Sequence, residues 1–254
     1  SIDNYKKALK INPDYVEVYN NMGNALKDKG DLEAAIDSYK QAIKIKPDYA
    51  EVYNNMGIVL KDKGDLEAAI DSYKQALKIK PDYVEVYNNM GIVLNDKGDP
   101  EAAIDSYKQA LKIKPDYVEV YNNMGNALKD KGDSEAAINS YKQALKINPD
   151  YADAYNNMGL VLLYKGDPEA AIDSYKQALK IKPDYVEVYN NMGNALNDKG
   201  DSEAAINSYK QALKINPDYA DAYNNMGLVL LYKGDPEAAI DSYKQALKIK
   251  PDYV

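Results

Sequence analysis

Proline recurs along this chain at a constant interval of 34 residues, and most other residue types keep the same interval. The repeating prolines stand at positions 13, 47, 81, 115, 149, 183, 217 and 251. A period of roughly 20 to 50 residues indicates stacked supersecondary units, because each unit can bury its apolar face only against its neighbours. The period therefore predicts an array of similar units, and length here counts units.

The composition excludes several kinds of chemistry. The chain has no Cys and no His, so it lacks the usual zinc ligands, a thiol nucleophile, a disulfide framework and an imidazole base. Carboxylates are plentiful, but each recurs with the repeat, and a catalytic pair copied into every unit is not expected. The segment 95–99 has part of a calcium-loop pattern, but Lys97 interrupts it, which favours a helix stop followed by an N-cap. We expect no catalytic residue, no metal and no cofactor.

The charge balance limits the class of partner. The formal net charge is -8, whereas nucleic-acid binding needs a basic stripe, so we expect no nucleic acid partner. Apolar runs such as 160–163 are too short to span a bilayer, and no targeting signal is visible. We therefore expect no membrane association and favour the cytoplasm as the compartment.

Residues 50–83 represent all the units, and their apolar pattern predicts a first helix. These apolar residues recur at steps of three and four, which gathers them on one side: Val52, Tyr53, Met56, Gly57, Val59 and Leu60. Asp48 is predicted as the N-cap with Glu51 completing a capping box, and Gly64 is predicted to end the helix.

A second helix is predicted after Gly64. Asp65 is its expected N-cap, and other units carry proline at the next position, where a helix tolerates it. Its apolar side is closed off by Pro81 and consists of Ala69, Ile70, Tyr73, Ala76, Leu77 and Ile79. Small residues on both helices let them approach closely, so a helical hairpin is expected.

This pattern resembles the tetratricopeptide repeat, whose signature is a 34-residue unit with an aromatic, Leu-Gly and Ala-x3-aromatic before proline. The signature places are occupied by Met56-Gly57, Ala69, Tyr73, Ala76 and Pro81, while Tyr53 and Leu60 stand for the more typical Trp and Tyr. The resemblance covers the whole chain. It implies an all-α fold, a right-handed superhelical α-solenoid of stacked antiparallel helix pairs.

The repeat divides the chain into a single solenoid over residues 1–254. Residues 1–15 hold the lone second helix of a truncated unit, and seven complete repeats follow at 16–49, 50–83, 84–117, 118–151, 152–185, 186–219 and 220–253. We expect a piece of a longer array whose exposed apolar ends could support end-to-end self-association.

Two columns of asparagine mark a candidate peptide-binding surface. The resemblance implies that the arc of each first helix opposite its buried side lines a concave groove, and a similar asparagine ladder occurs in the repeat domain of O-linked N-acetylglucosamine transferases. An amide has donors and an acceptor for the backbone of an extended peptide, although solvation or the capping of neighbouring helix ends is an alternative role. The first column is Asn20, Asn54, Asn88, Asn122, Asn156, Asn190 and Asn224, and the second is Asn21, Asn55, Asn89, Asn123, Asn157, Asn191 and Asn225.

Repeats five and seven carry apolar residues where the other repeats are mostly polar. We expect these side chains to anchor a partner at two places in the groove, with packing between repeats as the alternative. The residues are Leu160, Leu163, Tyr164, Leu228, Leu231 and Tyr232. A groove that clamps an acidic tail is disfavoured, because its only lysines, Lys27, Lys61 and Lys129, each stand beside an Asp.

These patterns predict a non-catalytic scaffold that binds a peptide or protein segment in its groove. Two alternatives remain open. The array could be the substrate-recruiting arm of a larger, glycosyltransferase-like enzyme whose catalytic domain lies elsewhere, or it could be a structural spacer.

Overall fold

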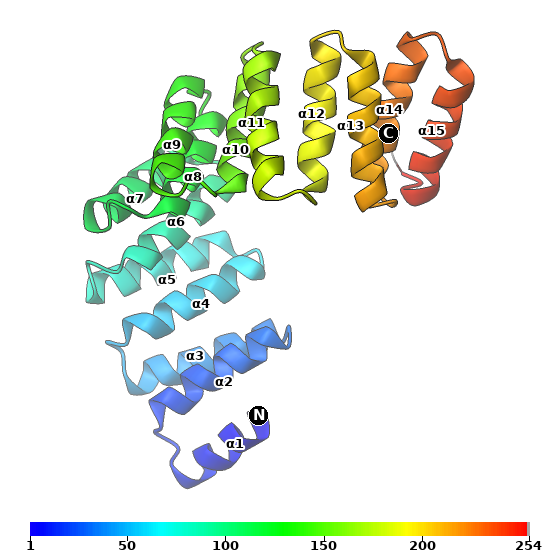
Figure 1. The fold of residues 1–254 in the computed structure, drawn as a ribbon. Helices are drawn as coiled ribbons and strands as arrows, with labels where there is room; N and C mark the ends of the chain where they lie inside the picture. The colour runs from blue at the N-terminus through cyan, green and yellow to red at the C-terminus, as the bar shows by residue number, and fades with distance from the viewer. Residues whose placement is uncertain (253–254) are drawn as a thin grey trace. The chain divides into compact units, whose positions relative to one another are not determined.

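The computed structural model describes residues 1–252, and in that range it is all-α, with 15 helices and no strand. The helices belong to two compact units, Ser1–Lys131 and the residues from Gly132 onward. The all-α fold of stacked helix pairs predicted from the repeat is confirmed (Figure 1). Tyr253, the last residue of the seventh predicted repeat, lies outside the described residues.

Helices of 13 and 14 residues alternate after the short first helix. The first unit contains α1 Ile2–Ile11, α2 Val16–Asp28, α3 Leu32–Ile45, α4 Ala50–Asp62, α5 Leu66–Ile79, α6 Val84–Asp96, α7 Pro100–Ile113 and α8 Val118–Asp130. The second contains α9 Ser134–Ile147, α10 Ala152–Tyr164, α11 Pro168–Ile181, α12 Val186–Asp198, α13 Ser202–Ile215, α14 Ala220–Tyr232 and α15 Pro236–Ile249.

Within each unit, a 13-residue helix packs most extensively on the 14-residue helix that follows it. In the first unit these pairs are α2 with α3, α4 with α5, and α6 with α7; in the second they are α10 with α11, α12 with α13, and α14 with α15. Within each unit, successive pairs then stack in chain order (Figure 1). Within each unit, consecutive first helices also contact one another, as α10 and α14 contact α12.

The second helices begin as predicted, but the first helices do not. Asp65 caps α5, since its carboxylate accepts a 3.2 Å hydrogen bond from the Ala68 N–H. At α4, however, the N-cap residue is Tyr49 and no side chain caps the helix, so the prediction of Asp48 as N-cap is wrong. Tyr49 is partly buried against the core, and this apolar packing places Asp48 one residue outside the cap.

The predicted stop at Gly64 is confirmed. Gly64 has φ +87°, in the left-handed region that glycine enters without steric cost. Its N–H donates to the Lys61 carbonyl at 2.8 Å, and the Asp65 N–H donates to the Leu60 carbonyl at 2.9 Å. This pair of bonds is the Schellman motif, and it turns the chain directly into the next helix.

The core of each hairpin is built around a tyrosine of the second helix. Tyr73 is completely buried, and a Cβ added at Gly57 would lie only 2.5 Å from its ring. Glycine is therefore required where the two helices cross. Val52 and Ala76 are also buried, whereas Ile79, predicted on the buried side, is exposed because it lies in the last turn of α5.

Candidate functional site

The first asparagine column lies largely inside the stack rather than on its surface. Asn20, Asn54, Asn122, Asn156 and Asn190 are buried, with Asn54 only 8% exposed. Asn88 and Asn224 are half-buried. The sequence predicted that this column lies on the open arc of the first helix, and that prediction is wrong because the side chains face the first helix of the next repeat.

The second column provides the partner for these buried amides. In five members of the second column, the side-chain N–H₂ donates a 3.0 Å hydrogen bond to the amide oxygen of the first column one repeat earlier, as Asn89 does to Asn54 and Asn191 to Asn156. The same bond joins Asn55 to Asn20, Asn123 to Asn88 and Asn225 to Asn190. Buried polar groups need such partners, so this ladder has a structural role between repeats.

The second column nevertheless remains open to a ligand. Asn21 is exposed, and Asn55, Asn89, Asn123, Asn157, Asn191 and Asn225 are half-buried. In the described part of the chain, the amide oxygen of Asn89 accepts no hydrogen bond, so it keeps both acceptor sites. These amides lie on one surface of each unit because consecutive first helices are in contact.

Most of the apolar residues that distinguish repeats five and seven from the other repeats are exposed. Tyr164 is 86% exposed and Tyr232 79%, and Leu160, Leu228 and Leu231 are exposed as well. Leu163 differs, because it is half-buried and packs against the core around α11. The alternative of packing between repeats therefore applies to Leu163, whereas the other members of this group form an open apolar surface.

The presence of leucine at position 160 is not explained by a contribution to folding stability. In the repeat that follows, Asn194 occupies the same position and accepts a 2.8 Å hydrogen bond from the buried hydroxyl of Tyr209. The matching hydroxyl of Tyr175 is buried and has no partner among residues 1–252. Leu160 thus exposes an apolar side chain and leaves a buried hydroxyl unpaired, and both are unfavourable for folding.

Four positions on each first helix share one face, and we call this set the first-helix stripe. They are separated by four, three and four residues, which brings them within a narrow arc of the helix. In the second unit the stripe consists of Asp153, Asn157, Leu160 and Tyr164 on α10, Glu187, Asn191, Asn194 and Asp198 on α12, and Asp221, Asn225, Leu228 and Tyr232 on α14.

Hollows between neighbouring second helices form a different feature, which the sequence did not predict. A hollow of about 520 Å³ lies over α6 between α5 and α7, with Tyr87, Met90 and Leu94 among its lining residues. Equivalent hollows of about 440 and 410 Å³ lie over α4 and α12. The sequence analysis missed these hollows because the apolar pattern predicts that the Tyr and Met positions lie wholly in the hairpin core. In the structure, residues such as Tyr87 and Met90 are half-buried and line the hollow.

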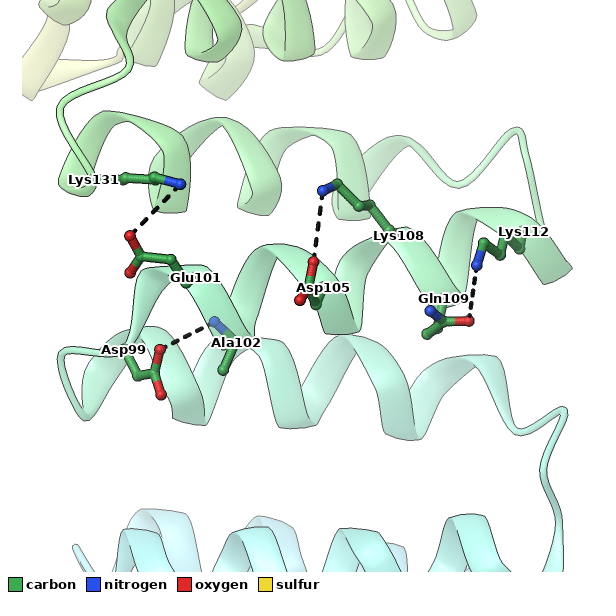
Figure 2. Close-up of polar contacts among 8 residues, drawn as sticks. All are labelled: Asp99, Glu101, Ala102, Asp105, Lys108, Gln109, Lys112 and Lys131. Carbon is green, nitrogen blue, oxygen red and sulfur yellow. Dashed lines mark hydrogen bonds and ion pairs between the residues drawn. The ribbon is translucent and has the colours of Figure 1, made fainter.

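Charged residues surround these hollows in a regular pattern. In Figure 2, Asp105 of the α6 hollow pairs with Lys108 at 3.5 Å, and Lys131 reaches Glu101 of the preceding repeat at 3.6 Å. The pairing between repeats recurs, for example between Lys63 and Glu33 at 2.8 Å. All of these groups are exposed to solvent, so the pairs contribute modestly to stability and leave the hollows without a strong charge.

Within residues 1–252, no set of three or more Asp and Glu side chains lies close enough to hold a metal ion. In the same range, no helix combines the length and apolar character needed to cross a membrane.

Two family models match the sequence. The model of the cilia and flagella-associated protein 70 C-terminal domain, which is a tetratricopeptide repeat model, matches residues 49–250. A tetratricopeptide repeat model matches residues 1–30 and 23–64. No curated protein matches the sequence significantly.

The chain is also similar to solved structures. The crystal structure of MamA is 33% identical, with a TM-score of 0.59, and the match covers 67% of this chain and 93% of MamA. YrrB, described as a tetratricopeptide repeat protein with an unusual peptide-binding site, is 24% identical with a TM-score of 0.61, covering 79% of this chain and all of YrrB. A tetratricopeptide repeat protein from Parabacteroides merdae is 19% identical with a TM-score of 0.75, and the match covers 94% of each chain.

Proposed function

Because the chain belongs to the tetratricopeptide repeat family, we propose that it is a non-catalytic scaffold that binds an extended protein segment along its first helices. Each helix pair with its loops acts as one repeat in the division at 16–49 and every 34 residues thereafter. Proteins of this fold typically mediate protein–protein interactions, and one structural relative is described as binding a peptide.

One observation carries the proposal: an open apolar surface stands beside a row of amides on the same helix faces. On α14, Leu228 and Tyr232 are exposed and lie three and seven residues after Asn225. Tyrosine and leucine supply apolar contact area, whereas the amide supplies hydrogen bonds to a peptide backbone. Together they meet the needs of an extended segment with occasional apolar side chains.

The buried first column leaves the peptide contact to the second column. Five of its members already donate one N–H to the amide of the preceding repeat, which fixes the orientation of these side chains. A binding group held in this way loses little conformational entropy when a ligand arrives. We assign backbone recognition to Asn55, Asn89, Asn123, Asn191 and Asn225, with Leu160, Tyr164, Leu228 and Tyr232 as side-chain anchors.

Variants drawn from the chain itself test this proposal. In the repeats without the apolar group, Asp198 stands in place of Tyr164 and Tyr232, and Asn194 in place of Leu160 and Leu228. Tyr164→Asp, Tyr232→Asp and Leu228→Asn together should therefore preserve the fold and abolish capture of the native partner. A photoreactive amino acid at Asn225 should crosslink that partner, and one at Gln109, in the α6 hollow, should not.

Two results would contradict the proposal. The first is unchanged capture by the triple variant when circular dichroism shows that it is folded. The second is crosslinking from Gln109 without crosslinking from Asn225, which would move the contact surface to the hollows of the second helices.

A further inference from the structure

The residues beside the first-helix stripe differ in charge between the two units, whereas the charged residues on the stripe itself are carboxylates in both. In the first unit, Lys27, Lys61 and Lys129 stand immediately before the last stripe position of α2, α4 and α8, and two of them pair with the neighbouring Asp28 and Asp130. In the second unit, Leu163, Asn197 and Leu231 occupy the corresponding positions. The stripe of the second unit is therefore flanked by no lysine at these positions.

Carboxylates are the only charged groups on the stripe of α10, α12 and α14. The four carboxylates are exposed and belong to Asp153, Glu187, Asp198 and Asp221. Asp153 accepts a 2.8 Å hydrogen bond from the hydroxyl of Tyr185, which holds its carboxylate in position without neutralising it. Lys182 lies over the ring of Tyr185, at the loop before α12 rather than on the stripe.

The exposed tyrosines and leucines lie among these carboxylates. Tyr164 and Leu160 are on α10, and Tyr232, Leu228 and Leu231 are on α14, on either side of the acidic and amide residues of α12. Carboxylates attract ammonium and guanidinium groups, and an exposed tyrosine ring can also bind a cation over its face. The tyrosine rings and the carboxylates therefore favour the same kind of ligand, one with cationic side chains.

We infer that the first helices of the second unit bind a cationic segment whose apolar side chains contact Leu160 and Leu228. This inference rests on the proposed function and adds the chemistry of the partner. Helices that pack together lie about 8–10 Å apart, so two steps from α10 to α14 cover about 20 Å. An extended chain rises about 3.3 Å per residue, so the two apolar side chains of the ligand should be about six residues apart.

Synthetic peptides of this design provide the test. The probe is a fluorescein-labelled peptide of about ten residues, with two Leu about six residues apart and Lys between them. One comparison peptide has Glu in place of Lys, and another has Ser in place of Leu. In fluorescence polarisation with the whole chain, the Lys–Leu peptide should bind most tightly, and its affinity should fall as salt is added.

Two matched double variants test whether the stripe carboxylates contribute to the affinity for the Lys–Leu peptide. Asp153→Asn with Glu187→Gln removes two stripe charges, and the Asn still accepts the Tyr185 hydroxyl; we expect about a fivefold loss of affinity, in the range of two exposed ion pairs. Asp173→Asn with Asp241→Asn makes the same change in net charge on α11 and α15, where Asn207 of α13 shows that asparagine is accepted. This control should bind like the parent chain.

The possible failures are distinct. The inference is overturned if the Lys–Leu peptide does not bind at low salt, if the Glu–Leu peptide binds equally well, or if the control variant loses as much affinity as the stripe variant. The proposed function survives these results as long as the Tyr164, Tyr232 and Leu228 substitutions still abolish capture of the native partner. Unchanged capture by that triple variant would instead overturn both.

Discussion

The hydroxyl of Tyr39 donates a 2.7 Å hydrogen bond to the side-chain oxygen of Asn24, whereas the hydroxyl of Tyr73, one repeat later, has no partner among the described residues. The difference arises at one position, because Ile58 stands where Asn24 stood. Both rings are completely buried. The chain therefore contains a natural comparison of a paired and an unpaired buried hydroxyl in nearly the same surroundings.

Replacing Tyr39 or Tyr73 by phenylalanine should have different effects on the free energy of unfolding. Tyr39→Phe leaves the Asn24 oxygen without its donor and should lower the free energy of unfolding by about 1 kcal/mol. Tyr73→Phe removes a buried hydroxyl that has no partner, so stability should be unchanged or slightly increased. Urea denaturation followed by circular dichroism would measure both. Equal losses in the two variants would show that the hydrogen bond to Asn24 does not contribute.

The buried tyrosines also predict the response to alkaline pH. Burial raises the pKa of Tyr73 and Tyr107 well above their ordinary value of 10.0. In the unfolded chain these hydroxyls ionise near pH 10, while in the folded chain they stay protonated. Their contribution to stability is complete below pH 10 and is lost as the pH rises beyond it.

Alkaline titration would check this prediction. The part of the tyrosinate absorbance that comes from the buried rings should appear only together with the loss of helix content, above about pH 10, because ionisation of these rings requires unfolding. Tyr73→Phe should move the midpoint of helix loss to higher pH. Complete tyrosine ionisation with the helices intact would contradict the assignment of these hydroxyls to the core.

Gly57→Ala should be strongly destabilising. The added Cβ would lie 2.5 Å from the Tyr73 ring, and that ring is enclosed by the hairpin and cannot move aside. Overpacking of this kind typically costs about 1–3 kcal/mol. Gly64→Ala is the comparison, since nothing lies within 4 Å of its added Cβ and the cost there comes only from φ +87°. A second substitution, Tyr73→Leu, should recover part of the loss in Gly57→Ala and none in Gly64→Ala.

The sequence predicts the helices well because the three- and four-residue apolar spacing, the glycine stops and the aspartate caps of the second helices are local signals. It predicts contacts between repeats less well. The burial of Asn54 depends on Asn89 from the next repeat, and nothing in one repeat distinguishes an amide that faces solvent from one that faces a neighbour. Tyr49 shows the same limit, because tertiary packing of its ring replaced the expected cap at Asp48.

The ion pair between repeats should be visible in the titration of one carboxyl group. The hydrogen bond from Lys63, together with its charge, lowers the pKa of Glu33 below its ordinary value of 4.5. This interaction favours the folded chain above that pH and is lost as the pH falls through the lowered pKa. In Lys63→Met, the pKa of Glu33 measured by nuclear magnetic resonance should rise toward 4.5. An unchanged pKa would show that the pair does not form in solution.

Leu163 and Leu231 occupy the same position in repeats five and seven but should respond differently to substitution. Leu163 is half-buried and packs against the core around α11, so Leu163→Asp removes apolar contacts and should cost about 1–2 kcal/mol. Leu231 is 48% exposed, so Leu231→Asp should change the free energy of unfolding by no more than about 0.5 kcal/mol. Urea denaturation separates the two effects. If Leu231→Asp were as destabilising as Leu163→Asp, Leu231 would belong to the core and could not serve as an open contact for a partner.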